Sequence, residues 1–397
     1  MKSKLVKLLI FVVAGVLILF FSNDFGLIDV EKTAIITAVA IDLDGENYKV
    51  TAQIAVPEAT DTKTENQRAQ ISGVGGTVGA AIKNVGDTSG WYPQLAFCNL
   101  IILGESLSDT DVIFILDYFS KTLRVQDSAL TVMAEGSAYE LLKLSTPLDN
   151  VSSFALQKIL LKNSGLNRDI AHCDVKTFCV DYYSVSESSF MPLIKVKSQK
   201  EENSKSDGSS EGQGQQTQSG VKGEYIFNAN STVLFYKGKK VGYLDEKQTL
   251  AFKVLKNDFS SSTFEVQNVS SLFERTHNYL LTVIKCKVKS YLKIEKQIPL
   301  FCVDVDMYVK ISDENTSGTD LDYIKNLPLP AAVKEKAELD MYENIESLIN
   351  AEKVTGCDFL GIKKELFRRH YDQYSAFKDS VISSFEYQIN VNVHGKS

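Results

Sequence analysis

Alternating apolar and polar positions predict a β-hairpin near the start of the chain. Residues 33–41 form an almost uninterrupted apolar run of the kind found in buried strands, and Asp44-Gly45 is typical of a tight turn. In residues 48–56 polar side chains alternate with apolar ones, so one face of the partner strand is expected to be buried.

The following region, up to residue 150, mixes short strands with helices. Helical spacing places Val112, Leu116 and Phe119 in one stripe, and Ser108 or Asp109 is expected to cap that helix. The expected elements are a small-residue helix over 76–85, a strand over 99–103, a helix over 109–123, a strand over 130–134 and a helix over 137–144.

The second half of the chain repeats this mixture with longer elements. A hairpin is expected around Lys237–Lys240, long strands over 281–294 and 303–311, helices over 331–353 and 363–370, and a last strand over 385–393. Because runs of strands are mixed with separate helices, the sequence predicts an α+β fold with antiparallel or mixed sheets, and not a doubly wound parallel sheet.

One stretch offers nothing to a hydrophobic core. Residues 198–220 consist of Ser, Gln, Gly, Glu, Lys, Asp, Asn and Thr, a composition that predicts a disordered linker or loop. The expected organisation is a signal anchor over 1–23, an N-terminal domain over 24–197, the polar linker over 198–221, a middle α/β domain over 222–280 and a C-terminal α/β domain over 281–397.

The extreme N-terminus has the pattern of a membrane segment. Lys2, Lys4 and Lys7 precede an apolar run over 8–21, a charge distribution that keeps the N-terminus in the cytoplasm. With Leu5 and Val6 the run reaches about 17 residues, the lower limit for a span. It lacks an A-x-A-like cleavage site, so we expect an uncleaved transmembrane signal anchor with the bulk of the chain extracytoplasmic.

Composition narrows the possible functions. The 397 residues suffice for two or three domains, and 43 Lys and Arg against 50 Asp and Glu give a net charge of −7. A nucleic-acid-binding protein normally carries a clustered basic excess, so no nucleic-acid partner is expected. The four histidines lie far apart in the sequence, which argues against a metallohydrolase or a histidine-dependent catalyst.

The six cysteines leave two interpretations open. Cys173 and Cys179 can pair across a turn, or they can be buried thiols. Alternation places Cys286 with apolar neighbours and Cys302 with acidic ones, so these two are expected to face different ways. The chain contains no C-x-x-C motif, which excludes a zinc ribbon or a thioredoxin-type site.

Three segments resemble catalytic motifs, and each has a simpler structural explanation. The glycine-rich stretch 73–79 fits neither phosphate-loop template, so it is interpreted as a flexible turn entering a helix. Asp304 and Asp306 share a strand face and suit an acid–base pair or a cation, but a solvated sheet face has the same pattern. His172 and Cys173 are adjacent, and adjacent side chains usually diverge.

Two further groups of residues suggest surfaces. Arg368-Arg369-His370 and Lys237–Lys240 are small basic clusters that suit an anionic partner, but charged turns and helix ends account for them equally well. Trp91-Tyr92-Pro93 suits a membrane interface or a sugar, although such a cluster usually belongs to a core. We therefore expect no catalytic, cofactor-binding or metal-binding residues, and no cofactor.

Four segments, in order, resemble the Ger(x)C family of spore germination proteins, the C subunits of nutrient germinant receptors in endospore-forming bacteria. They are residues 34–42 (AIITAVAID), the glycine-rich segment and strand over 73–105, the hairpin over 229–246, and residues 358–369 with the closing strand 387–395. Most relatives carry a cysteine followed by Trp-Asp after the signal, where residues 20–24 here read FFSND. A transmembrane anchor would then replace the lipid anchor.

The resemblance implies a non-enzymatic, membrane-anchored receptor subunit of three mixed α/β domains, in the spore inner membrane or cell membrane. It would act by protein–protein assembly with polytopic A and B subunits and contribute to germination in response to nutrients. The alternative is a generic membrane-anchored extracytoplasmic sensor or cell-wall-facing binding protein built on the same scaffold.

Overall fold

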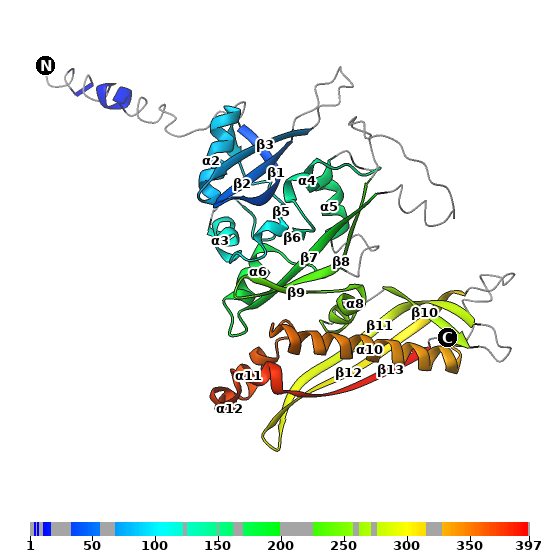
Figure 1. Ribbon diagram of the computed structural model, residues 1–397. Coiled ribbons are helices and arrows are strands. Elements are labelled where there is room, and N and C mark those ends of the chain that lie inside the picture. The colour runs from blue at the N-terminus through cyan, green and yellow to red at the C-terminus, as the bar shows by residue number, and fades with distance from the viewer. Residues whose placement is uncertain are drawn as a thin grey trace.

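The structure is a computed structural model that describes most of the chain in two β-sheets with their helices (Figure 1). The described residues are 4, 6–7, 11–16, 33–55, 68–121, 125–147, 149, 151–161, 170–198, 225–256, 262–270, 276–314 and 328–395. Apart from Ser198, the expected polar linker over 198–221 lies outside them. Within these ranges, no helix is both long and apolar enough to cross a membrane.

The larger sheet, sheet A, runs from residue 33 to residue 244. Its strand order is β3-β2-β1-β5-β6-β7-β8-β9, with β4 paired to β1. The strands are β1 (Thr33–Asp44), β2 (Asn47–Ala55), β3 (Arg68–Gly75), β4 (Tyr92–Gln94), β5 (Leu100–Leu103), β6 (Leu130–Ala134), β7 (Ser188–Ser198), β8 (Tyr225–Tyr236) and β9 (Lys239–Leu244). Asp44 pairs with Asn47, which confirms the hairpin predicted at the start of the chain.

The centre of sheet A is parallel and buried on both faces. Strands β1, β5, β6 and β7 run parallel, and every residue of β5 and β6 is buried. Helices α2 (Val78–Ser89), α3 (Ile113–Lys121) and α6 (Val175–Tyr182) pack on one face, and α4 (Ala138–Lys143) and α5 (Ser152–Leu160) pack on the other. Helices on both faces explain why these strands are apolar runs without alternation.

The glycines over 73–79 allow α2 to lie directly against β3. A Cβ atom on Gly73 would lie 2.2 Å from the Ala81 carbonyl oxygen, and one on Gly75 would lie 2.6 Å from the Ala81 nitrogen. The Thr77 hydroxyl accepts a hydrogen bond from the Ala80 amide at 3.1 Å and so caps the helix. The glycine-rich stretch therefore permits close packing of α2 against β3 where the helix begins.

Helix α3 begins later than the predicted residue 109, and the expected cap residues do not cap it. Asp111 accepts a hydrogen bond from the Ile113 amide at 3.1 Å and a second from the Tyr182 hydroxyl at 3.0 Å. Gly238, in the β8–β9 turn at φ +73°, lies directly against Asp111. A Cβ atom at this position would lie 1.7 Å from an Asp111 oxygen, so the contact requires glycine. The turn therefore fixes where the helix starts.

The smaller sheet, sheet B, has the order β10-β11-β12-β13. Its strands are β10 (Thr263–Ser270), β11 (Thr276–Glu295), β12 (Ile298–Glu314) and β13 (Glu386–Gly395), and the first three are antiparallel while β13 is parallel to β12. The long helix α10 (Ala331–Thr355) runs along one face (Figure 1). Its buried residues recur every three or four positions, as in an amphipathic helix: Val333, Ala337, Met341, Ile345, Leu348, Ile349 and Glu352.

An aromatic cluster joins sheet A to α8 and to the segment that follows α10. Phe252, on α8 (Glu246–Leu255), packs edge-to-face against Phe190 of β7 and against Phe359, with ring centroids 4.8 Å and 5.6 Å apart. All three rings are at least 90 % buried. Sheet A, α8 and the segment after α10 therefore share one hydrophobic core.

Buried polar groups connect the same regions. The Asp358 carboxylate accepts hydrogen bonds from the Ser186 hydroxyl and from the first amides of α11 (Ile362–Arg369), and the Asp358 amide donates to the Ser188 hydroxyl at 2.9 Å. Nearby Glu352 is fully buried, and one of its oxygens accepts a hydrogen bond from the Leu360 amide at 2.9 Å. Short helices α12 (Tyr371–Phe377) and α13 (Val381–Ser384) lead from α11 to β13.

The α+β class with mixed sheets is confirmed. The expected domain boundaries stay a prediction. In the range 222–280, β8 and β9 belong to sheet A whereas β10 belongs to sheet B. Cys286 lies opposite Met307 and Cys302 lies opposite Tyr291, which confirms that the two thiols are on different faces of sheet B, and all six cysteines are free.

Candidate functional site: a groove between α8, β10 and α10

The aspartate pair on β12 forms part of a polar sheet face. Asp304 accepts a hydrogen bond from the Asn390 amide at 2.8 Å, and Asp306 accepts one from Asn392 at 3.2 Å. His394 lies 3.5 Å from Asp306 and stacks on a neighbouring tyrosine. Among the described residues, no group of three metal-ligating side chains forms here or elsewhere.

The cysteine beside His172, Cys173, is buried. Desolvation raises the pKa of the Cys173 thiol, and the thiol lies 3.5 Å from the Asp174 carbonyl oxygen. Nucleophilic cysteines have lowered pKa values instead. This environment favours the structural interpretation of the residue.

The two basic clusters are largely engaged in local contacts. Lys237 lies 3.8 Å from Glu187, and Lys240 lies 3.3 Å from Glu105. Arg369 pairs with Glu365 at 2.7 Å, and the His370 ring bonds the Leu292 carbonyl at 3.0 Å. These contacts favour charged turns and a helix end over a dedicated anion site.

The Trp91 segment is not a core cluster, contrary to the expectation from its aromatic character. Tyr92 begins β4, and the Trp91 side chain keeps 49 % of its surface exposed. The reason is that β4 lies at the start of β1, where the sheet ends.

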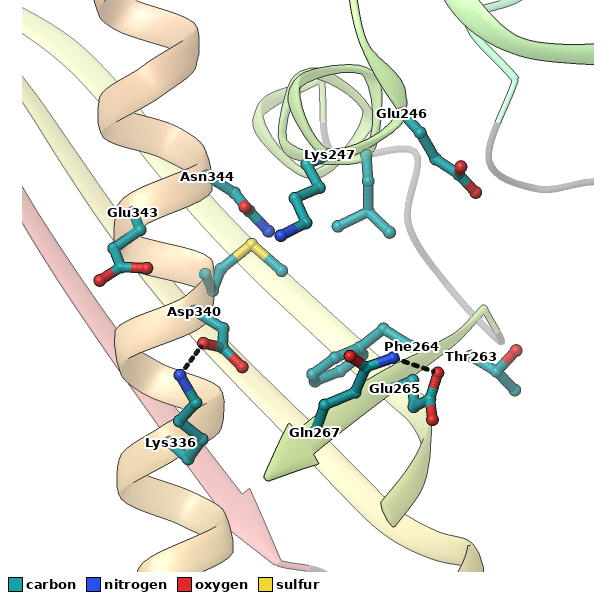
Figure 2. A pocket seen from close by; sticks show the side chains of 12 residues that line it. Glu246, Lys247, Thr263, Phe264, Glu265, Gln267, Lys336, Asp340, Glu343 and Asn344 are labelled. Atoms are coloured by element: carbon teal, nitrogen blue, oxygen red, sulfur yellow. Dashed lines mark hydrogen bonds and ion pairs between the residues drawn. The ribbon is translucent and has the colours of Figure 1, made fainter. Parts of the chain in front are cut away.

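A groove of about 560 Å³ lies between α8, β10 and α10 (Figure 2). Its volume is in the range of small-molecule or peptide side-chain sites. Leu250 of α8, Phe264 of β10 and Met341 of α10 supply its apolar surface. Each of these side chains comes from an amphipathic element that turns its apolar residues toward the shared core.

The helices that form the groove are held in place by polar contacts. Asp245 and Gln248 form a capping box at the start of α8, with Asp245 accepting from the Gln248 amide at 2.8 Å. The Gln248 side chain also donates to the Ser347 hydroxyl of α10 at 3.0 Å. This hydrogen bond connects the first turn of α8 to α10.

Acidic groups outnumber basic groups at the rim. The charged lining residues are Glu246, Glu265, Asp340 and Glu343 against Lys247 and Lys336. Lys336 is bound to Asp340 at 2.7 Å, while Lys247 and Asn344 project toward one another (Figure 2). The arrangement suits binding of a group that is apolar and basic, and it places no nucleophile beside a general base.

Sequence reasoning did not find this groove. Its walls come from residues 246–250, 263–267 and 336–344, which no local motif connects. The amphipathic pattern of 331–353 indicated that one face of α10 is buried, but the pattern carries no information on the partner elements.

Comparisons with known proteins match the chain in two parts. A family model described as "Spore germination protein N-terminal domain" matches residues 27–196, and one described as "Spore germination B3/ GerAC like, C-terminal" matches residues 230–396. No curated protein matches the sequence.

A solved structure described as "Crystal Structure of the GerBC protein" is similar in fold. The TM-score is 0.53 at 16 % sequence identity, and the alignment covers 90 % of this chain and 97 % of that one. The described arrangement of two sheets thus occurs over nearly the whole length of a second chain.

Proposed function

This chain belongs to the GerAC-like, or Ger(x)C, family of spore germination proteins, and from that premise we propose that it is a membrane-anchored subunit of a nutrient germinant receptor that acts by protein–protein assembly. The family consists of germinant-receptor subunits that are not known as enzymes. The observation that carries the proposal is the match of both family models, in order, over residues 27–196 and 230–396.

The proposed partners are the polytopic A and B subunits of the receptor. The proposed anchor is the segment over 1–23, whose lysines precede the apolar run over 8–21. That charge order favours a cytoplasmic N-terminus and an extracytoplasmic body, in the spore inner membrane or the cell membrane.

We assign the groove to contact with a basic segment of another receptor subunit. Four carboxylates against two ammonium groups at the rim favour a basic partner, and the apolar surface of Leu250, Phe264 and Met341 supplies area to bury. Complementary charge at such a rim acts mainly on partner choice and association rate.

Gene deletion tests the receptor role. We expect spores without this gene to lose germination toward particular nutrients, while the yield of heat-resistant spores stays unchanged. Normal germination toward every nutrient would contradict the proposal. Co-purification of polytopic receptor subunits from membranes distinguishes it from a generic extracytoplasmic sensor, which would lack them.

Charge reversal tests the groove separately. Glu265→Lys and Glu343→Lys change exposed rim residues and should leave stability within about 0.5 kcal/mol of the unchanged chain. We expect them together to reduce recovery of the partner subunits at least threefold. Glu46→Lys, at the exposed β1–β2 turn, is the matched control. If the groove variant and the control variant recover equal amounts of the partner subunits, the groove is not part of the interface.

A further inference from the structure

The end of sheet A at which β1 begins exposes large apolar side chains. Trp91 is 49 % exposed, Phe97 is 55 % exposed and Ile35 is 37 % exposed. We call these three residues the β1/β4 edge. Single exposed apolar side chains are ordinary on a protein surface, whereas a group of them at one end of a sheet indicates an interaction surface.

Strand pairing and hydrogen bonds from backbone amides hold the β1/β4 edge together. Strand β4 pairs in parallel with the first residues of β1, so that Thr33 lies opposite Tyr92 and Ile35 lies opposite Gln94. The Trp91 amide donates to the Ser89 hydroxyl at 3.1 Å, and the Asn99 amide donates to the Thr37 carbonyl at 3.1 Å. Trp91 and Phe97 therefore lie along the same edge of β1, the one that does not pair with β2.

The segments that form this edge carry no charge. Residues 33–41 and 88–104 contain no Asp, Glu, Lys or Arg, although such residues make up 23 % of the chain. These two segments thus present aromatic, aliphatic and uncharged polar groups. Tryptophan and tyrosine with uncharged neighbours are typical of the headgroup region of a bilayer.

The same edge is the part of the folded body closest along the chain to the apolar N-terminal run. Residues 22–32 separate Phe21 from Thr33, and a chain of that length spans at most about 40 Å when fully extended. The start of β1 consequently has to remain near the membrane surface if the run over 8–21 is anchored there.

We propose that the β1/β4 edge lies in the lipid headgroup region of the membrane, with Trp91 and Phe97 inserted at the water–lipid interface. This inference rests on the proposed anchoring. It gives the extracytoplasmic body a defined orientation, with sheet A next to the lipid at the N-terminal end of its parallel strands.

Trp91 is the single tryptophan of the chain and reports on this contact directly. The full chain is reconstituted in phosphatidylethanolamine–phosphatidylglycerol vesicles, with bromine on the acyl chains either near the headgroup or near the methyl end. We expect at least twofold quenching by the shallow bromines, weaker quenching by the deep ones, and protection from aqueous acrylamide. Full acrylamide access without bromine quenching would overturn the inference.

A relocated tryptophan is the matched control. Phe114 is 70 % exposed on α3, and α3 follows the opposite end of the parallel strands, where Leu103 pairs with Ile41. In the double variant Trp91→Phe, Phe114→Trp we expect no bromine quenching and free access of acrylamide. Equal quenching at both positions would indicate adsorption without orientation and would overturn the inference.

Flotation of the vesicles in alkaline carbonate separates the two proposals. A chain released by carbonate would refute the anchoring and this inference together. A chain retained in the vesicles with Trp91 exposed to water would refute the inference alone. Shielding of Trp91 that requires added polytopic subunits would place a protein at this edge and overturn the lipid contact.

Discussion

Removal of the Phe252 ring should destabilise both sheets at once. Phe252 is 1 % exposed and packs edge-to-face between Phe190 of β7 and Phe359, which follows α10. Phe252→Ala would leave a cavity at the place where sheet A, α8 and the C-terminal segment meet. The loss is therefore expected to spread beyond α8.

The structure gives the magnitude of the effect. Truncation of a buried phenylalanine to alanine costs about 3–5 kcal/mol through lost transfer energy and the cavity. Two edge-to-face pairs, each worth about 0.5–1.5 kcal/mol beyond burial, place this residue in the upper part of that range. We expect a loss of about 4–5 kcal/mol in the free energy of unfolding. That loss is a large fraction of the net stability of a typical domain, about 5–15 kcal/mol.

Equilibrium unfolding in urea measures this loss with two probes. Trp91 fluorescence follows sheet A, and circular dichroism follows the whole chain, both in the full-length protein in mild detergent. We expect both transitions to shift to lower urea. Phe252→Leu should cost about 1–2 kcal/mol because it keeps most of the volume.

The matched control is Phe114→Ala, which removes the same ring from a side chain that is 70 % exposed. It should change the free energy of unfolding by no more than about 0.5 kcal/mol. A loss below about 1 kcal/mol for Phe252→Ala, or an unchanged Trp91 transition, would refute the shared core.

Three further predictions concern buried polar groups. Burial raises the pKa of Glu352 well above its ordinary value, so the folded state binds that proton more tightly than the unfolded state does. Stability should therefore fall as pH rises through the raised pKa. In thermal unfolding from pH 5 to 9, the melting temperature of Glu352→Gln should depend less on pH than that of the unchanged chain. Asp358→Ala should cost about 2–4 kcal/mol, because the Ser186 hydroxyl and two α11 amides lose their acceptor. In a double-mutant cycle with Ser186→Ala the two losses should be non-additive by at least about 0.5 kcal/mol, and additive losses would exclude the contact. Burial raises the pKa of Cys98 to about 12, so iodoacetamide at pH 8 should modify this thiol only after unfolding; its modification in the folded chain, seen by mass spectrometry, would contradict the burial.

Local pattern was enough to predict the elements whose stability comes from one continuous apolar face. The hairpin predicted over 33–41 and 48–56 is β1 and β2, and the helix predicted over 331–353 is α10, which ends two residues later, at Thr355. In each case the spacing of the buried positions can be recognised from residues that are close together in the sequence. The family resemblance, which rested on four short segments, is confirmed by the two family models.

Contacts between distant segments decided the rest. The helix over 109–123 starts at Ile113 because Asp111 bonds Tyr182 and lies against the β8–β9 turn, and no residue near 111 indicates either partner. Glu352 is a charged residue type that is normally exposed, but it completes the buried stripe of α10. The groove and the β1/β4 edge likewise require segments that are far apart in sequence. The sequence by itself determined which stretches of this chain bury a face, because that depends on the period of the residues. Only the tertiary structure decided which faces meet and which stay open, because that depends on the packing of elements that are distant in sequence and come together only when the chain folds.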